Sequence, residues 1–198
     1  MKHIYTFLCL LLIGGVGQVG AFSDVDLEKL KSTNECKKCD FSGANLGGAR
    51  LRATNLAEAD LTGADLTGAD FYSANLTNAY LTGGNLHKAN LENVNLTGAN
   101  LAGANLIDIF MEDTNLQEAN LAGVDLTKVY MEATELTGAN LTMANLTSAF
   151  LEGIDLEHVD LTDAVLTDAR LNWAKNLDKA ILCRTTMPDR TVNNSGCE

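Results

Sequence analysis

A five-residue unit, Ala-Asn/Asp-Leu-x-x, repeats without a break from Cys39 to Trp173 and constrains the fold more than any other feature of this sequence. Leu or a close substitute occupies every fifth position from Phe41 to Leu171. Of these 27 central positions, 23 are Leu, two are Phe and two are Met. The residue two before the centre is Ala in 16 of the 27 units. So regular a period indicates a stack of similar structural units.

A period of five excludes the ordinary secondary structures. On an α-helix five residues advance about 500°, so successive central side chains would share no face. On a flat strand an odd period sends successive side chains to opposite faces. A short strand that turns a corner every five residues keeps every central Leu inside, and four such sides close a square coil of twenty residues.

Variant units that lie twenty residues apart support this coil independently. Three of them depart from the consensus in the same way, as expected if they stack on one face: Ile109-Phe110-Met111-Glu112, Val129-Tyr130-Met131-Glu132 and Ala149-Phe150-Leu151-Glu152. The other faces carry columns of Asn and Thr, which are typical of well-paired β layers.

On these repeats the chain resembles the pentapeptide-repeat proteins, over roughly two-thirds of its length. The resemblance implies an all-β solenoid, a right-handed quadrilateral β-helix of about seven coils. The central residue and the residue two before it face inward, and the other three face outward. At about 4.8 Å per coil, the repeats of residues 39–173 form a rod roughly 30 Å long.

Residues 1–21 have the parts of a signal peptide. Lys2 provides the positive start, Ile4 to Val16 is an apolar run, and small residues precede Phe22. Cleavage before Phe22 predicts an exported protein of the periplasm, the thylakoid lumen or the extracellular space. The alternative is an uncleaved anchor, which is disfavoured because the apolar run is short for a membrane span.

A short capping helix is predicted within residues 22–38. Ser23 is its expected N-cap, Asp26 completes a capping box, and Leu27 and Leu30 form a narrow apolar stripe. We expect this helix to cover the open end of the first coil, because a bare end exposes strand edges and apolar side chains.

The segment 174–198 is expected to cover the other end of the rod. Its sequence continues the pattern one residue late, with Asn176-Leu177 and Ile181-Leu182 in the positions of a repeat.

Four cysteines remain after signal cleavage: Cys36, Cys39, Cys183 and Cys197. The first two form a Cys-x-x-Cys motif, for which a structural disulfide, a redox centre and half of a metal site are the alternatives. A zinc site needs two further ligands nearby, and the other cysteines lie beyond the far end of the rod. Two bridges are favoured in an exported chain, and the rod favours the pairs Cys36–Cys39 and Cys183–Cys197.

The composition is acidic, with 26 Asp and Glu against 14 Lys and Arg, a formal net charge of −12. This balance argues against binding to nucleic acids or anionic membranes. The sequence has no serine-hydrolase, phosphate-loop or zinc-protease motif, and a coil filled with Leu offers no pocket of its own. We therefore expect a monomer that is not an enzyme, without catalytic residues, cofactor or metal, and with an unidentified protein as its partner.

One face of the predicted rod carries unusual residues. An aromatic column and an acidic column run side by side: Phe110, Tyr130 and Phe150, and Glu92, Glu112, Glu132 and Glu152. Stacked exposed aromatics form an apolar stripe and stacked Glu side chains repel, so both columns favour an interaction surface. Two alternatives remain: the aromatic ladder stabilises neighbouring coils and nothing more, or the Glu column holds a divalent cation, for which a flat column converges poorly.

The sequence thus predicts an exported, non-catalytic structural or protein-interaction module. The second hypothesis is a DNA mimic that inhibits or protects DNA gyrase or another topoisomerase, as the resemblance implies for some members of the family. Those members act in the cytoplasm, commonly as dimers joined through their C-terminal ends, whereas this chain starts with an export signal and ends in a cysteine-closed segment.

Overall fold

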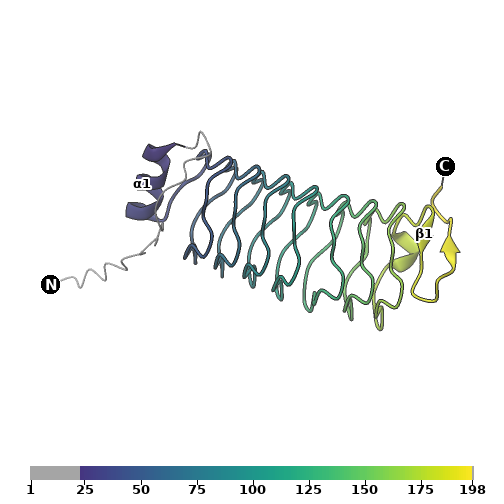
Figure 1. Ribbon diagram of the computed structural model, residues 1–198. Helices are drawn as coiled ribbons and strands as arrows, with labels where there is room; N and C mark the ends of the chain where they lie inside the picture. The colour runs from purple at the N-terminus through teal and green to yellow at the C-terminus, as the bar shows by residue number, and fades with distance from the viewer. Residues whose placement is uncertain (1–22, 198) are drawn as a thin grey trace.

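The computed structural model describes residues 23–197, which form a rod of stacked coils with a helix at one end and a small hairpin at the other (Figure 1). The elements outside the coils are helix α1 (Asp24–Thr33), the 3-10 helix η1 (Leu177–Lys179) and strands β1 (Thr185–Thr186) and β2 (Val192–Asn193). The predicted signal peptide, residues 1–21, lies outside the described residues. Within residues 23–197, no helix has the length and apolar character to cross a membrane.

Each coil takes twenty residues and has four sides. The residue before each centre pairs in parallel with the residue twenty positions later, and one rung from each side illustrates the pattern: Asn55↔Asn75, Asp60↔Tyr80, Asp65↔Asn85 and Asp70↔Asn90. The four-sided coil predicted from the period is confirmed. Its right-handed sense stays a prediction.

The corners are tight turns, and one unit shows why the repeat has its composition. The amide of Ala64 donates to the carbonyl of Leu61 over 3.1 Å, and Gly63 between them has φ +63°. A positive φ at this third position belongs to a type II turn, which Gly adopts without steric cost. Oδ1 of Asp60 accepts the amide of Thr62 at 2.9 Å, so the Asn or Asp of each unit holds the start of its turn.

The interior of the rod is filled by two residues of each unit. The central Leu81 and Leu86, like Ala79 and Ala89 two positions before a centre, have no exposed surface. One continuous buried cluster runs from Leu27 in α1 through the coils. The predicted inward positions are therefore confirmed.

The N-terminal end contains the predicted helix. Oγ of Ser23 accepts the amide of Asp26 at 3.2 Å and caps α1. Leu27 and Leu30 are buried in the same cluster as Cys36 and Cys39, and these two cysteines form a disulfide. That α1 serves to cover the first coil stays a prediction.

The register slips by one residue near the C-terminal end, as expected. The slip was expected to begin before Asn176, but it begins after Lys175 and first appears in the pairing of Ile181. The rungs Asp160↔Ile181 and Val165↔Thr186 are offset by an extra residue, whereas Lys175 still pairs with Asp155 in the regular register. Asn176 takes a left-handed conformation with φ 54°, and its side chain, not its backbone, bonds Asp155 at 2.8 Å. The extra residue is accommodated in the η1 turn that follows.

The last segment is held by a disulfide and by ion pairs. Cys183 and Cys197 are bonded, as predicted, and β1 and β2 pair antiparallel beside them. Cations of this segment reach acids of the preceding coil: Lys179 to Glu157 at 2.7 Å, Arg184 to Asp163, and Arg190 to Asp168 at 3.2 Å.

We expect the double substitution Cys183→Ser with Cys197→Ser to lower the free energy of unfolding by about 2–4 kcal/mol, because it removes a cross-link that restricts the unfolded chain. The double substitution Cys36→Ser with Cys39→Ser is expected to lower the free energy of unfolding by less. The disulfide that it removes joins residues separated by 3 positions, whereas Cys183 and Cys197 are separated by 14. Urea unfolding of both double variants measures the difference, and a larger loss from the first pair of cysteines would contradict it.

Acid is expected to loosen the C-terminal segment before the coils. The Arg184 guanidinium lowers the pKa of Asp163, and the Asn176 side chain lowers the pKa of Asp155, both from an ordinary value of 3.8. Because the folded-state pKa values are the lower ones, this stabilisation is complete above pH 3.8 and is lost as the pH falls through them.

Hydrogen exchange of residues 176–190, corrected for intrinsic rates, should therefore increase relative to the coils below pH 3.8. The substitution Asp163→Asn should remove part of that pH dependence. An unchanged acid profile in this variant would show that the ion pair contributes nothing.

Candidate functional site

The aromatic and acidic columns lie on one side of the rod. We call the seven residues Phe110, Tyr130, Phe150, Glu92, Glu112, Glu132 and Glu152 the aromatic–glutamate face. Phe110 and Tyr130 are 64% and 56% exposed. Glu112, Glu132 and Glu152 are exposed as well, whereas Glu92 is half-buried. Large apolar side chains with this exposure form a surface patch that water solvates poorly.

Two of the three aromatics form a stack that ends on a cation. The rings of Tyr130 and Phe150 have centroids 4.0 Å apart with an interplanar angle of 10°. The guanidinium carbon of Arg170 lies 4.6 Å from the centroid of Phe150. Ring stacking and cation–π contacts each contribute about 0.5–1.5 kcal/mol, so this three-residue column is held rigidly on the surface.

Phe110 does not continue that stack, which corrects the expected stripe of three. Within the described residues, the rungs Phe110–Tyr130 and Asn105–Asp125 have no bridge, although the rungs before and after them on the same two sides are paired. The coil therefore opens along two adjacent sides between residues 105–110 and 125–130.

The backbone hydrogen bonds show the extent of this opening. In a regular side the central amide donates to the next coil, as Leu86 does to Asn105 at 2.9 Å and Leu126 to Asn145 at 2.8 Å. Among the described residues, no such backbone bond is made by the amides of Leu106, Asp108 and Met111. Beyond the opening, the amide of Asp113 donates to the next coil again, to the carbonyl of Glu132 at 3.1 Å.

The interior side chains explain why the coils separate at this place. Ile109 and Val129 occupy the inward position that is Ala in the other five units of this column: Ala49, Ala69, Ala89, Ala149 and Ala169. Two branched side chains thus meet directly above one another in a layer built for Ala. Overpacking a core costs about 1–3 kcal/mol, and spreading the coils relieves it.

A control within the chain supports this explanation. Val159 also replaces Ala at an inward position, but its neighbours in the column are Ala139 and Ala180. Both rungs beside it, Asn140↔Asp160 and Asp160↔Ile181, are paired. In a column of Ala, one branched side chain between two Ala neighbours is accommodated, whereas Ile109 above Val129 is not.

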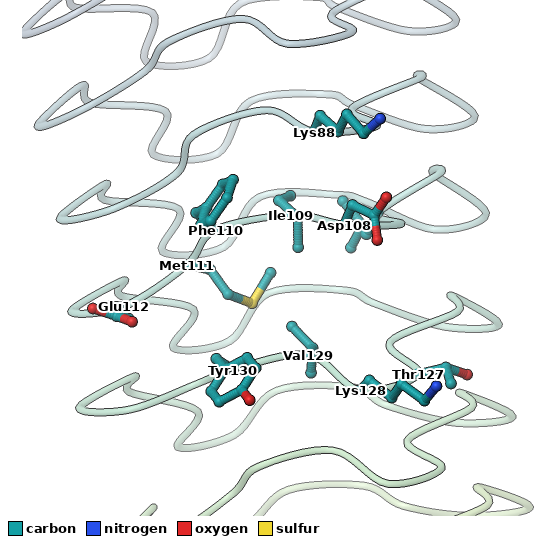
Figure 2. Close-up of a pocket in the computed structure, with 11 residues that line it drawn as sticks. Lys88, Asp108, Ile109, Phe110, Met111, Glu112, Thr127, Lys128, Val129 and Tyr130 are labelled. Carbon is teal, nitrogen blue, oxygen red and sulfur yellow. The ribbon is translucent and has the colours of Figure 1, made fainter.

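The opening forms a cleft of ≈ 680 Å³ between two coils (Figure 2). The side chains of Ile109 and Val129 point toward one another across it, and Met111 lies between the two strands. The charged residues lie at its ends, with Lys88, Asp108 and Lys128 at one end and Glu112 at the other. A smaller hollow of ≈ 390 Å³ adjoins it beside the Tyr130–Phe150 stack.

The structure offers no converging set of ligands to a metal ion on this face. Within residues 23–197, the one group of three metal-ligating side chains close enough to share an ion is Asp26, Cys36 and Cys39. Its two sulfurs are joined in a disulfide and are not available as thiolates.

The cleft is the feature that the sequence analysis missed. The matching units with Phe110, Tyr130 and Phe150 led to the prediction of a continuous stack, and a packed coil led to the prediction that no pocket exists. The signal was present in Ile109 and Val129, twenty residues apart in a column of Ala.

Comparison with known families identifies the class of protein. The family model described as pentapeptide repeats matches in 8 copies, over residues 35–71, 74–113, 114–153 and 139–175. The chain belongs to the pentapeptide-repeat family. A comparison with curated protein sequences found no match.

Several solved structures of this family are similar to the chain. HetL, involved in heterocyst differentiation regulation in the cyanobacterium Nostoc sp. strain PCC 7120, is 31% identical; the match covers 80% of this chain and 83% of HetL, with a TM-score of 0.43. The plasmid-mediated fluoroquinolone resistance protein QnrB1 is 22% identical over 70% of this chain and 77% of its own, with a TM-score of 0.44. A pentapeptide-repeat protein of the Arabidopsis thaliana thylakoid lumen is 23% identical over 67% and 77%, with a TM-score of 0.37.

We predict a measurable energetic coupling between Tyr130 and Phe150. Because the rings stack, the loss of stability on replacing both by Ala should differ from the sum of the single losses by about 0.5–1.5 kcal/mol. Tyr80 is a matched control, since it is 53% exposed on a different side of the coil. Urea unfolding of the single and double variants gives the free energies for this double-mutant cycle. A coupling energy between Phe150 and Tyr80 as large as that between Phe150 and Tyr130 would contradict the prediction.

Proposed function

We propose that this protein is an exported, non-catalytic module that binds a protein partner through the aromatic–glutamate face. The observation that carries the proposal is the stacked column of exposed Tyr130, half-buried Phe150 and exposed Arg170, beside exposed Glu side chains. Aromatic and Arg side chains are enriched at the centres of protein interfaces, and charged residues at their rims.

The chemistry of this face defines the kind of partner. An apolar groove or aromatic side chain of the partner would cover the Tyr130–Phe150 stack. Basic side chains of the partner would pair with Glu112, Glu132 and Glu152. Stacked carboxylates repel one another, so neutralisation by a cationic partner removes an unfavourable interaction. The rod supports this face through one continuous buried cluster that runs from α1 through the coils.

Export is part of the proposal and is supported by two observations. Residues 1–21 have the composition of a signal peptide, and both cysteine pairs are bonded in the structure. Disulfides persist in oxidising compartments such as the periplasm, a lumen or the cell exterior. We propose that the mature chain acts there as a monomer, with no cofactor.

A second candidate function is a DNA mimic that acts on a gyrase or topoisomerase. The acidic composition, with a formal net charge of −12, favours it. Inhibition of gyrase-catalysed supercoiling by the mature protein would support this function. Full supercoiling activity at an equimolar or higher concentration of the mature protein would exclude it.

The primary function is tested by cross-linking the mature protein in its native compartment. The wild-type chain is expected to capture a specific exported protein, and the double variant Tyr130→Ala/Glu132→Ala to lose at least tenfold of that capture. The control variant is Tyr80→Ala/Glu135→Ala, which removes an exposed Tyr and an exposed Glu from other sides of the rod. Equal capture by both double variants would contradict the assignment of the face.

A further inference from the structure

The cleft between residues 105–110 and 125–130 has the size and lining of a small-molecule site, independently of any protein partner. Its ≈ 680 Å³ falls within the range of about 300–1,000 Å³ that ligand pockets occupy. Leu106, Ile109, Met111 and Val129 form its apolar wall and are buried. Such a site buries the apolar part of a ligand and orients it through a few polar groups.

Polar groups that the regular coil uses internally are available here. The amides of Leu106, Asp108 and Met111 make no backbone hydrogen bond within the described part of the chain. In a closed coil these amides would donate to Asp125, Thr127 and Tyr130 of the next layer. Backbone donors that have lost their partners gain free energy from any acceptor that enters the cleft.

Two lysines stand at the same end of the cleft as Asp108 (Figure 2). Elsewhere on the rod, charges twenty residues apart form ion pairs, as Lys38 does with Glu58 at 3.2 Å. Lys88 and Lys128 each lie twenty residues from Asp108, yet no carboxylate of residues 23–197 is within ion-pair distance of either. Two ammonium groups and one carboxylate leave this end of the cleft with a net positive charge.

The cleft is closed at both ends by intact coil. The adjoining sides are paired through Asn100↔Asn120 and Asn115↔Glu135, so the two unpaired rungs of the described residues lie on adjacent sides of one coil. This favours a compact ligand over an extended protein segment, which would need an open path along the strands.

We propose that this cleft binds a small amphipathic molecule with an apolar body and a single anionic group. The apolar body lies in the space opened beside the overpacked side chains, against the apolar wall of the cleft. The anionic group lies at the end with Lys88 and Lys128, within reach of amides that the opening leaves without backbone partners. Glu112 at the opposite end excludes a second anionic group from the ligand.

The same two side chains that open the coil provide the decisive variant. Ile109→Ala with Val129→Ala restores the Ala column of this side, so the two unpaired rungs should close and the cleft should disappear. Val159→Ala is the matched control, because it also trims a branched inward side chain but lies beside rungs that are paired.

The experiment titrates the mature protein with 8-anilinonaphthalene-1-sulfonate, followed by fluorescence, and then competes it with dodecanoate. We expect the probe to bind at one site and dodecanoate to displace it from that site. Val159→Ala should bind as the wild type does, Ile109→Ala/Val129→Ala should bind at least tenfold more weakly, and Lys88→Gln/Lys128→Gln about tenfold more weakly. Circular dichroism melting establishes that each variant is folded.

Amide chemical shifts on dodecanoate binding locate the site without any variant. Changes centred on residues 105–111 and 125–130 support the proposal, whereas changes centred on Trp173 or absent from these residues overturn it. Unaltered affinity in a folded Ile109→Ala/Val129→Ala variant overturns it as well. If that variant does not fold, the lysine variant and the shift map decide.

Discussion

The volume of the inward side chains in each layer is the constraint on which this structure depends. A coil touches only the coils before and after it, so a layer that holds four central residues and four small ones must fit the spacing of its backbone hydrogen bonds. Leu81 and Ala79 satisfy that requirement and are fully buried. Ile109 above Val129 does not, and there the hydrogen bonds between coils are lost instead of the packing.

The two functional proposals have this local conflict in common. Tyr130 belongs both to the aromatic–glutamate face and to the wall of the cleft, and its ring stacks on Phe150 and not on Phe110 because the coil opens between residues 110 and 130. A regular solenoid has identical sides and no preferred place for a ligand. The stacked branched residues at one level give this rod a distinct location, and both proposals place binding there.

Much of the fold was predictable because it is local. The five-residue period predicted the four-sided coil, the inward Leu and Ala, and the end at which each cysteine pair forms its bond. The beginning of the register slip was misplaced, since Asn176 bonds Asp155 through its side chain while Lys175 retains the backbone pairing. The cleft was missed because its cause is a sum over two layers: Ile109 and Val129 are each ordinary apolar residues, and their combined volume matters only when they stack.

Residue-resolved amide hydrogen exchange of the mature protein tests the central claim most directly. If packing has opened the coil, the amides of Leu106, Asp108 and Met111 exchange far faster than those of Leu86 and Leu126. Leu86 and Leu126 stand one coil before and one coil after Leu106 in its column, and their amides bond the next coil. The amide of Asp113, which bonds the next coil at 3.1 Å, is expected to be protected. Equal protection of Leu106, Met111 and Leu86 would show that the coil is closed and would contradict the account.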